Sequence, residues 1–201
     1  MQFTNIAASL ALVTAVLGST IRRTIPENYE IGTMKFNGSI HGVPWYGEGT
    51  IQEIYAEFTK AHPDAAANDK REPKPVPAKR QLHGDPNKYG EQCCPIPGEQ
   101  YGNADNGAIT DGIAYLKEVD AYCNCGPTSC VRISCSDSAA IFLCNDTDEE
   151  IWNGCNYMAT FAQDIMDDCT TISPPPLWYQ SCCGQEYHTN GFHVVVRYDS
   201  C

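Results

Sequence analysis

Two things are scarce in this sequence: long apolar runs, and basic residues in its second half. The longest apolar run, residues 6–17, has twelve residues, which is too short to anchor a chain stably across a bilayer. Residues 81–201 contain 17 Asp and Glu side chains against four Lys and Arg. A segment this acidic repels phosphate backbones and anionic lipid headgroups. We therefore expect no transmembrane segment and no nucleic-acid partner.

The common motifs of enzymes and metal sites are also absent. The sequence contains no G-x-S-x-G nucleophile motif, no P-loop and no dinucleotide-binding glycine pattern. It has no Cys-x-x-Cys pair and no paired histidine spacing of the kind that binds zinc. The acidic run 146–150 lacks the central glycine and distal glutamate of an EF-hand, and it suits the positive end of a following helix better. These absences favour a protein without catalysis, cofactor or metal.

Cysteine is missing from residues 1–92 and frequent afterwards. About 10 per cent of residues 81–201 are cysteine, a composition typical of secreted disulfide scaffolds. The even number predicts six bridges, formed in an oxidising compartment. The cysteines expected to pair are Cys93, Cys94, Cys123, Cys125, Cys130, Cys135, Cys144, Cys155, Cys169, Cys182, Cys183 and Cys201.

The N-terminal half has the features of a secreted precursor. Residues 1–19 combine a short apolar stretch with small residues at its end, as in a signal peptide. Residues 69–80 form a proline-rich linker that ends in the dibasic pair Lys79-Arg80, where the charge balance and the cysteine content both change. We predict a signal peptide (1–19), a pro-segment (20–80) removed by a kexin-type protease, and an extracellular mature domain (81–201).

The predicted pro-segment is not featureless. Ile51, Ile54, Tyr55 and Phe58 fall at helical spacing. The segment either assists folding or is a spacer that contains one amphipathic helix, and we favour the spacer.

Two sequons indicate N-glycosylation. Asn37 begins the first, in the predicted pro-segment, and Asn145 begins the second, in the predicted mature domain. Asn145 is therefore the glycosylation site expected on the mature protein.

The apolar pattern after residue 81 predicts an α+β fold. Two helices and three strands are clear, and a weak strand precedes them, which gives the order (β)αββαβ. This order permits a small, disulfide-rich, ferredoxin-like sandwich with both helices on one face of the sheet. The predicted helices are 108–119 and 151–169, and the predicted strands are 130–135, 139–144, 192–198 and, weakly, 91–96.

Some of these segments resemble a group of known proteins. The pieces are 134–136, 140–146, the helix between two cysteines, and 191–197 followed by Cys201. They resemble the small cysteine-rich secreted proteins of filamentous fungi, many of which are kexin-processed effectors with a role in virulence. The expected topology is also similar to the killer toxin of smut fungi, an α/β sandwich cut from a precursor. The resemblance supplies no catalytic residue to carry over.

One group of residues suggests catalysis. Glu186, His188, His193 and Arg197 could provide the base, acid and cation of a ribonuclease-like site. The alternation of the last strand places His193 and Arg197 on its outward face, and Glu186 and His188 are expected in a turn. A solvated strand face explains the four residues as well, and the acidic composition opposes an RNA substrate.

Trp178 and Tyr179 follow the triproline 174–176. Exposed aromatic residues dominate binding hot spots, so this pair either contacts a partner or packs in the core. We expect a non-enzymatic secreted effector or toxin-like protein that binds a host or competitor protein with a basic patch. The alternative is a small secreted hydrolase of the ribonuclease type.

Overall fold

The computed structural model describes residues 29–66 and 85–201. The predicted signal peptide and the Lys79-Arg80 pair lie outside these residues. In chain order, the strands and helices are β1 (Glu30–Gly32), β2 (Lys35–Ile40), β3 (Val43–Glu48), α1 (Ile51–Ala61), α2 (Pro63–Ala66), β4 (Lys88–Cys93), β5 (Ala104–Asp105), α3 (Asn106–Glu118), β6 (Asp120–Cys125), β7 (Ser129–Ser136), β8 (Ala139–Asn145), β9 (Ile151–Gly154), α4 (Cys155–Cys169), β10 (Thr170–Ile172), β11 (Gln180–Cys182), β12 (Gly184–His188) and β13 (Phe192–Tyr198).

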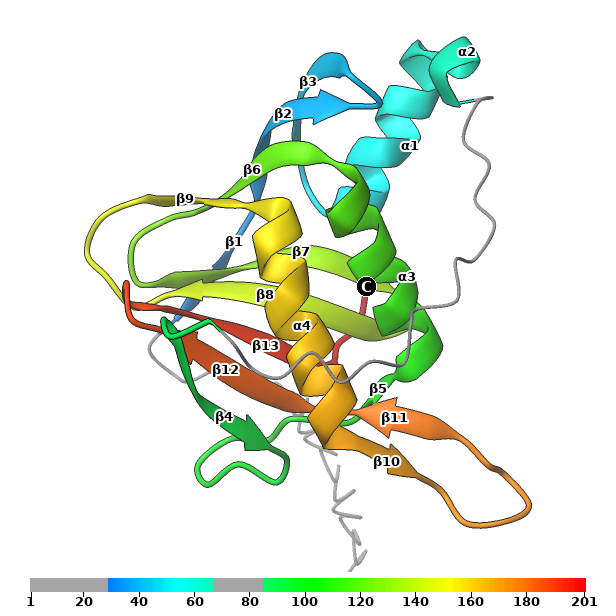
Figure 1. Cartoon of the computed structure of the whole chain (residues 1–201), viewed down its shortest axis with the longest axis vertical. Coiled ribbons are helices and arrows are strands. Elements are labelled where there is room, and N and C mark those ends of the chain that lie inside the picture. The colour runs from blue at the N-terminus through cyan, green and yellow to red at the C-terminus, as the bar shows by residue number, and fades with distance from the viewer. Residues whose placement is uncertain (1–28, 67–84) are drawn as a thin grey trace, which may run out of the picture.

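The largest sheet has six strands in the order β1-β7-β8-β13-β12-β4. All neighbouring pairs are antiparallel except β1 and β7, which are parallel. Helices α3 and α4 lie side by side across one face of this sheet, as the sequence predicts (Figure 1). The α+β class is therefore confirmed. The strand order differs from that of the predicted sandwich, because β12, which was not predicted, lies between β13 and β4. Strand β4, the first strand of the predicted mature domain, is therefore at an edge of the sheet.

The predicted elements are present with small changes at their ends. Asp105 caps α3, since its Oδ1 accepts a hydrogen bond of 2.9 Å from the Ala108 amide. Every residue of β8 is buried, which explains its continuous apolar run. The second predicted helix starts four residues late, because residues 151–154 instead pair with β6 as strand β9. The acidic run 146–150 therefore precedes a strand and does not lie at the start of α4, whose first turn has no acidic residue.

Residues 30–61 are part of the fold and not a spacer. Strand β2 lies between β3 and β6 in a four-stranded sheet of order β3-β2-β6-β9. Phe36, Ile54 and Phe58 are fully buried in the same core cluster as residues of α3, β8 and α4. The helix expected at residues 51–58 is α1, and its stripe of apolar residues faces this core.

Five disulfides form, not the six that the sequence predicts. Cys155, at the start of α4, is bonded to β6, and Cys169, at its end, is bonded to β4. Each cysteine of this helix therefore pairs with another element, as expected. Cys125 and Cys182 remain thiols. The bridges are Cys93–Cys169, Cys94–Cys183, Cys123–Cys155, Cys130–Cys144 and Cys135–Cys201.

The position of the two thiols explains the missing bridge. Cys125 pairs in β6 with Ile151, just before α4, whereas Cys182 pairs in β11 with Thr170, just after it. A helix of 15 residues is about 22 Å long, far beyond the reach of a disulfide. The five bridges that do form indicate folding in an oxidising environment. Among the described helices, none is long and apolar enough to cross a membrane.

Candidate functional site

The feature that stands apart from the body of the protein is a hairpin. Strands β10 and β11 are antiparallel and join β5 in a small sheet. The loop 173–179 between them extends away from the helices and the large sheet (Figure 1). A hydrogen bond of 2.8 Å from the Ser173 amide to the Tyr179 carbonyl closes this loop. We call residues 170–182 the apolar hairpin.

Two disulfides fix the base of the apolar hairpin. Cys169, just before β10, bonds Cys93, and Cys183, just after β11, bonds Cys94. The consecutive residues Cys93 and Cys94 are thus bonded to opposite ends of the hairpin. Asn106 adds a hydrogen bond of 2.8 Å from its Nδ2 to the Thr170 hydroxyl. The base is thus rigidly joined to the body, and the tip projects from it.

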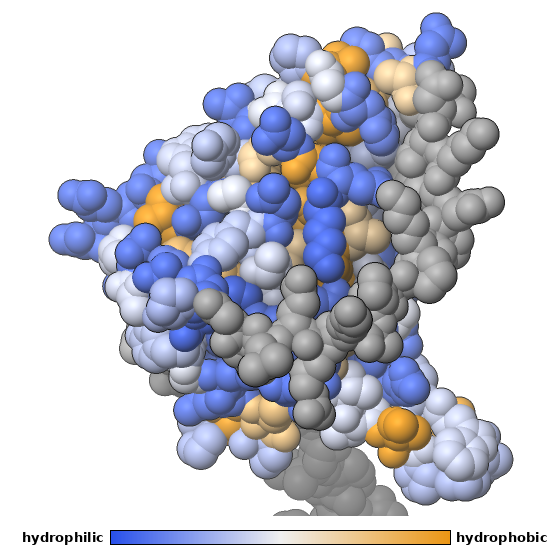
Figure 2. Space-filling view, viewed as in Figure 1, coloured by the Kyte–Doolittle hydropathy of each residue, from blue (hydrophilic) through white to orange (hydrophobic). Residues whose placement is uncertain are grey.

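The tip of the hairpin is apolar and exposed. Leu177 is 77 % exposed, Trp178 68 %, Ile172 59 % and Tyr179 45 %. In Figure 2 the hairpin projects at the lower right, where an orange group lies near its base and the outer tip has pale, near-neutral colours. The exposure of Trp178 and Tyr179 excludes the core-packing interpretation of this pair. An exposed cluster of large apolar side chains is a typical mark of an interaction site.

The backbone at the tip is also unusual. Trp178 has a φ of 44°, in the left-handed region that large side chains rarely adopt. Such a conformation costs free energy and persists where surrounding structure enforces it, often at functional sites. The left-handed backbone at Trp178 is a second unusual feature of the tip, beside its exposure.

Sequence reasoning found the two aromatic residues of the tip but missed Leu177 and Ile172. A signal for the whole hairpin was present. Residues 169–185 contain no charged residue, in a chain with a net charge of −12, and cysteines flank the run. The uncharged run with its proline triplet and flanking cysteines coincides with the hairpin.

Acidic side chains surround the base of the hairpin. Asp105 pairs with Ser181 in the small sheet, and the exposed Asp167 and Asp168 end α4 directly before β10. Partial burial and the nearby Asp105 carboxylate raise the pKa of the Tyr179 phenol above its ordinary value. The site thus combines an uncharged tip with an acidic rim formed by Asp105, Asp167 and Asp168.

The four residues of the ribonuclease-like hypothesis do not come together. Glu186 and His188 lie on the face of the large sheet that α4 covers, and His193 and Arg197 lie on the opposite face. All four side chains are buried, so the prediction of a solvated strand face is also wrong. Both faces of the sheet are covered, the far face in part by Tyr29 and Tyr101.

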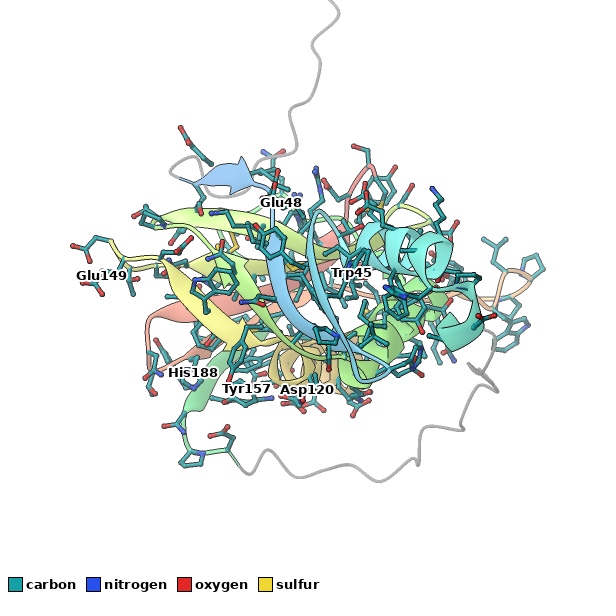
Figure 3. All side chains as sticks on the ribbon, turned by 90° about the horizontal axis from the view of Figure 1, so that it is seen from above. Trp45, Glu48, Asp120, Glu149, Tyr157 and His188 are labelled. Carbon is teal, nitrogen blue, oxygen red and sulfur yellow. A yellow bond between two sulfur atoms is a disulfide. The ribbon has the colours of Figure 1, made fainter. Side chains whose placement is uncertain are left out.

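On the helix side, Glu186 and His188 have structural partners. The Lys88 ammonium lies 2.5 Å from Asp164 and 3.8 Å from Glu186. His188 stacks on Phe192 with ring centroids 4.5 Å apart and meets the Tyr157 ring edge-on at 5.8 Å (Figure 3). Burial lowers the pKa of His188 below its ordinary value, which favours a neutral ring.

On the other side, His193 and Arg197 belong to a second set of contacts. His193 Nδ1 lies 3.0 Å from the Asp146 carboxylate, which also accepts a hydrogen bond of 2.5 Å from the Tyr29 hydroxyl. The Arg197 guanidinium lies 4.7 Å from the Phe142 ring centroid and 3.3 Å from Asp199. These contacts join β13 to its neighbours and to residues far away in the sequence.

The predicted glycosylation site Asn145 has a different role. Its side chain is fully buried, and its amide nitrogen donates to the carbonyls of Gly126 (2.8 Å) and Glu149 (2.7 Å). A glycan would attach through this nitrogen, so the folded protein has no room for one at this position. Asn37, in the other sequon, is exposed on β2. The expectation for Asn145 is therefore corrected.

A pocket of about 340 Å³ opens between α1 and β7. Its charged groups are already engaged. Glu53 accepts from the Thr50 amide at 2.7 Å, and Arg132 lies 2.5 Å from Asp199. Within residues 29–66 and 85–201, no three His, Cys, Asp or Glu side chains gather as they would around a metal ion. The apolar hairpin is therefore the best-defined candidate site.

The chain was compared with other proteins at three levels. Comparison with protein-family models, with curated proteins and with solved structures found no match.

Proposed function

We propose that this is a secreted fungal effector or toxin-like protein that acts by binding a host or competitor protein in the extracellular space. One observation carries the proposal: the tip of a disulfide-anchored hairpin exposes Leu177 and Trp178 to solvent. Large apolar side chains that are rigidly presented supply most of the affinity in protein interfaces. The proposal includes no catalytic step.

The surroundings of the tip indicate the chemistry of the partner. The tip itself is uncharged, while Asp105, Asp167 and Asp168 surround its base. A partner that fits this surface has an apolar cleft for the tip and basic residues at the edge of the cleft. The acidic body supports a protein partner over an anionic lipid surface, because it repels phosphate groups.

Secretion and kexin processing belong to the same proposal. The dense disulfides support an extracellular location, and the sequence between the two halves supports a cut after Arg80. The similarity to the smut-fungus killer toxin remains a proposal that rests on the expected topology and processing alone, which is fold-level analogy.

The test is a comparison of matched surface variants. Wild-type protein and the double variant Leu177→Ser/Trp178→Ser are immobilised and exposed to host apoplastic or extracellular fluid, and any protein recovered is produced and titrated directly. The control is Tyr122→Ser, since Tyr122 is also an exposed aromatic residue but lies on β6, in the body. We expect the tip variant to weaken binding of the identified partner at least tenfold and the control to leave it unchanged.

Other outcomes would contradict the proposal. Equal binding by wild type and tip variant would show that the hairpin is not the contact. Binding of the wild-type tip to uncharged lipid vesicles, with no protein partner recovered, would replace the protein partner by a membrane.

The hydrolase alternative has no observation in its favour. Its four residues lie on two faces of a sheet and are engaged in other contacts. A ribonuclease would need its base, acid and cation around one phosphate.

A further inference from the structure

The N-terminal segment, residues 30–61, is bound to the rest of the protein like a subunit. Strand β2 pairs with β6 over four residues, from Phe36 opposite Cys123 to Ser39 opposite Asp120. Strand β1 adds a parallel edge to the large sheet beside β7. The segment therefore completes two sheets whose other strands follow residue 85.

The contact between β2 and β6 is unusually close. A Cβ atom at Gly38 would clash with the Ala121 backbone and with the Asp120 carbonyl oxygen. Only glycine permits this approach of the two backbones. The fit shows that β2 and β6 are matched surfaces.

Helix α1 forms the second part of the contact (Figure 3, where Trp45 marks the adjoining β3). The Gln52 side chain binds β7 twice: its Nε2 donates to the Ser134 hydroxyl at 2.7 Å, and its Oε1 accepts from the Cys135 amide at 3.2 Å. The rings of Tyr55 and Tyr115 meet at 5.1 Å, which joins α1 to α3.

The apolar part of this interface is large. These side chains of the N-terminal segment are all 3 % exposed or less and share one cluster with the later residues: Met34, Phe36, Ile40, Ile51, Ile54, Tyr55 and Phe58. Burial of such side chains drives association in the same way whether or not the chain is continuous. No cysteine precedes residue 93, so no disulfide contributes.

We propose that cleavage at Lys79-Arg80 does not release the N-terminal segment, and that the processed protein is a non-covalent complex of two chains. The inference uses the predicted cut, which lies outside the described residues, but the contacts named here join residues before 62 to residues after 85, all of which the structure describes. Release would remove β2 from one side of β6, leave β9 as its remaining neighbour in this sheet, and expose the apolar core. The sequence-based mature domain, residues 81–201, is therefore incomplete without its former pro-segment.

The full chain without its signal peptide provides the test. It is treated with a kexin-type protease and analysed by native size-exclusion chromatography with intact mass measurement. We expect two chains in one peak, and their separation in 6 M guanidinium without reductant. Elution of the 81–201 chain alone under native conditions would overturn the proposal, and so would resistance of the dibasic pair to the protease.

Matched variants test whether the described interface holds the chains. Gly38→Val should cause loss of the N-terminal chain after the cut, whereas Tyr46→Ser, on the exposed side of β3, should retain it. Should Gly38→Val fail to fold before the cut, Gln52→Ala serves instead. Removal of its two hydrogen bonds should raise the dissociation constant of the cut complex about tenfold. Equal retention in Gln52→Ala and wild type would contradict the assigned interface. None of these results depends on the hairpin or on its partner.

Discussion

At the scale of single residues, Cys125 and Cys182 separate this protein from a fully bridged scaffold. Burial raises the pKa of the Cys125 thiol to about 11 and that of Cys182 to about 12. The thiolate is the reactive form, so both groups are almost entirely protonated near neutral pH. They are structural side chains and poor nucleophiles.

This leads to a labelling prediction. Native protein treated with iodoacetamide at pH 8 should gain no label, because both thiols are buried and protonated. Protein unfolded in guanidinium without reductant should gain two labels, which intact mass and peptide mapping would assign to Cys125 and Cys182. Rapid labelling of native protein, or no labelling of unfolded protein, would contradict the structure. The second result would indicate a sixth bridge.

Alternation along β13 predicts Phe192, Val194, Val196 and Tyr198 on the inward face. The first three lie in the main core, whereas Tyr198 is only partly buried. His193 and Arg197 are buried because residues far away in the sequence, such as Tyr29 and Tyr101, cover the second face of the sheet. A local pattern states which side of a strand is apolar, but it does not reveal what a remote segment places over the other side.

At the scale of elements, helix α1 begins with a capping box. Thr50 Oγ1 accepts from the Glu53 amide at 3.4 Å, and the Glu53 carboxylate accepts from the Thr50 amide at 2.7 Å. The predicted helix at this position is thus supported by its start signal as well as by its apolar spacing.

Thr50→Ala should lower the free energy of unfolding by about 1 kcal/mol, the typical contribution of such a cap. Because α1 shares the core with the rest of the protein, the loss should appear in the main unfolding transition, measured by denaturant titration of the uncut chain. Thr50→Ser keeps the hydroxyl and is the control. If the alanine and serine variants unfold alike, the cap does not stabilise this helix.

The elements that sequence reasoning missed have weak local patterns. Strand β6 carries Asp120 and Asn124 among its cysteines, and β12 carries Gln185, Glu186 and His188. A short segment rich in polar residues is predicted as a turn, because its sequence does not show which strands will bury those residues. Here Glu186 is buried beside Lys88 of β4, a residue 98 positions away. Long apolar runs such as β8 were found because they need no such context.

At the scale of the whole molecule, an exposed apolar hairpin projects from a chain with a net charge of −12. In the proposed complex, the hairpin would supply the apolar contact and the acidic body the electrostatic attraction. Electrostatic attraction to a basic partner raises the association rate and is screened by salt.

Affinity for the partner should therefore fall as the salt concentration rises from 50 to 500 mM. Asp167→Asn/Asp168→Asn, at the rim, should reduce this salt dependence. Glu149→Gln is the control, because Glu149 lies on the far side of the molecule from the hairpin (Figures 1 and 3). Titration by surface plasmon resonance would measure each slope. Identical slopes for the rim variant and wild type would remove the acidic rim from the site.

The extent of the folded unit is where the structure differs most from what the sequence predicts. Composition and cysteine content change near residue 80, yet the core continues across that position. Composition suggested a boundary at residue 80, whereas burial shows that residues before and after it share one core. The pairing of β2 with β6, which the sequence does not reveal, shows that the compositional boundary is not the boundary of the folded unit.

The paired cysteines at the base of the hairpin have an evolutionary consequence. Cys93 and Cys94 fasten the two ends of one loop, and the seven residues between β10 and β11 contribute nothing to the main core. Substitutions and insertions there should leave the packing of the body unchanged. Such a loop can diversify rapidly under selection by a changing target, and it offers a position where a foreign recognition sequence can be grafted onto a stable scaffold.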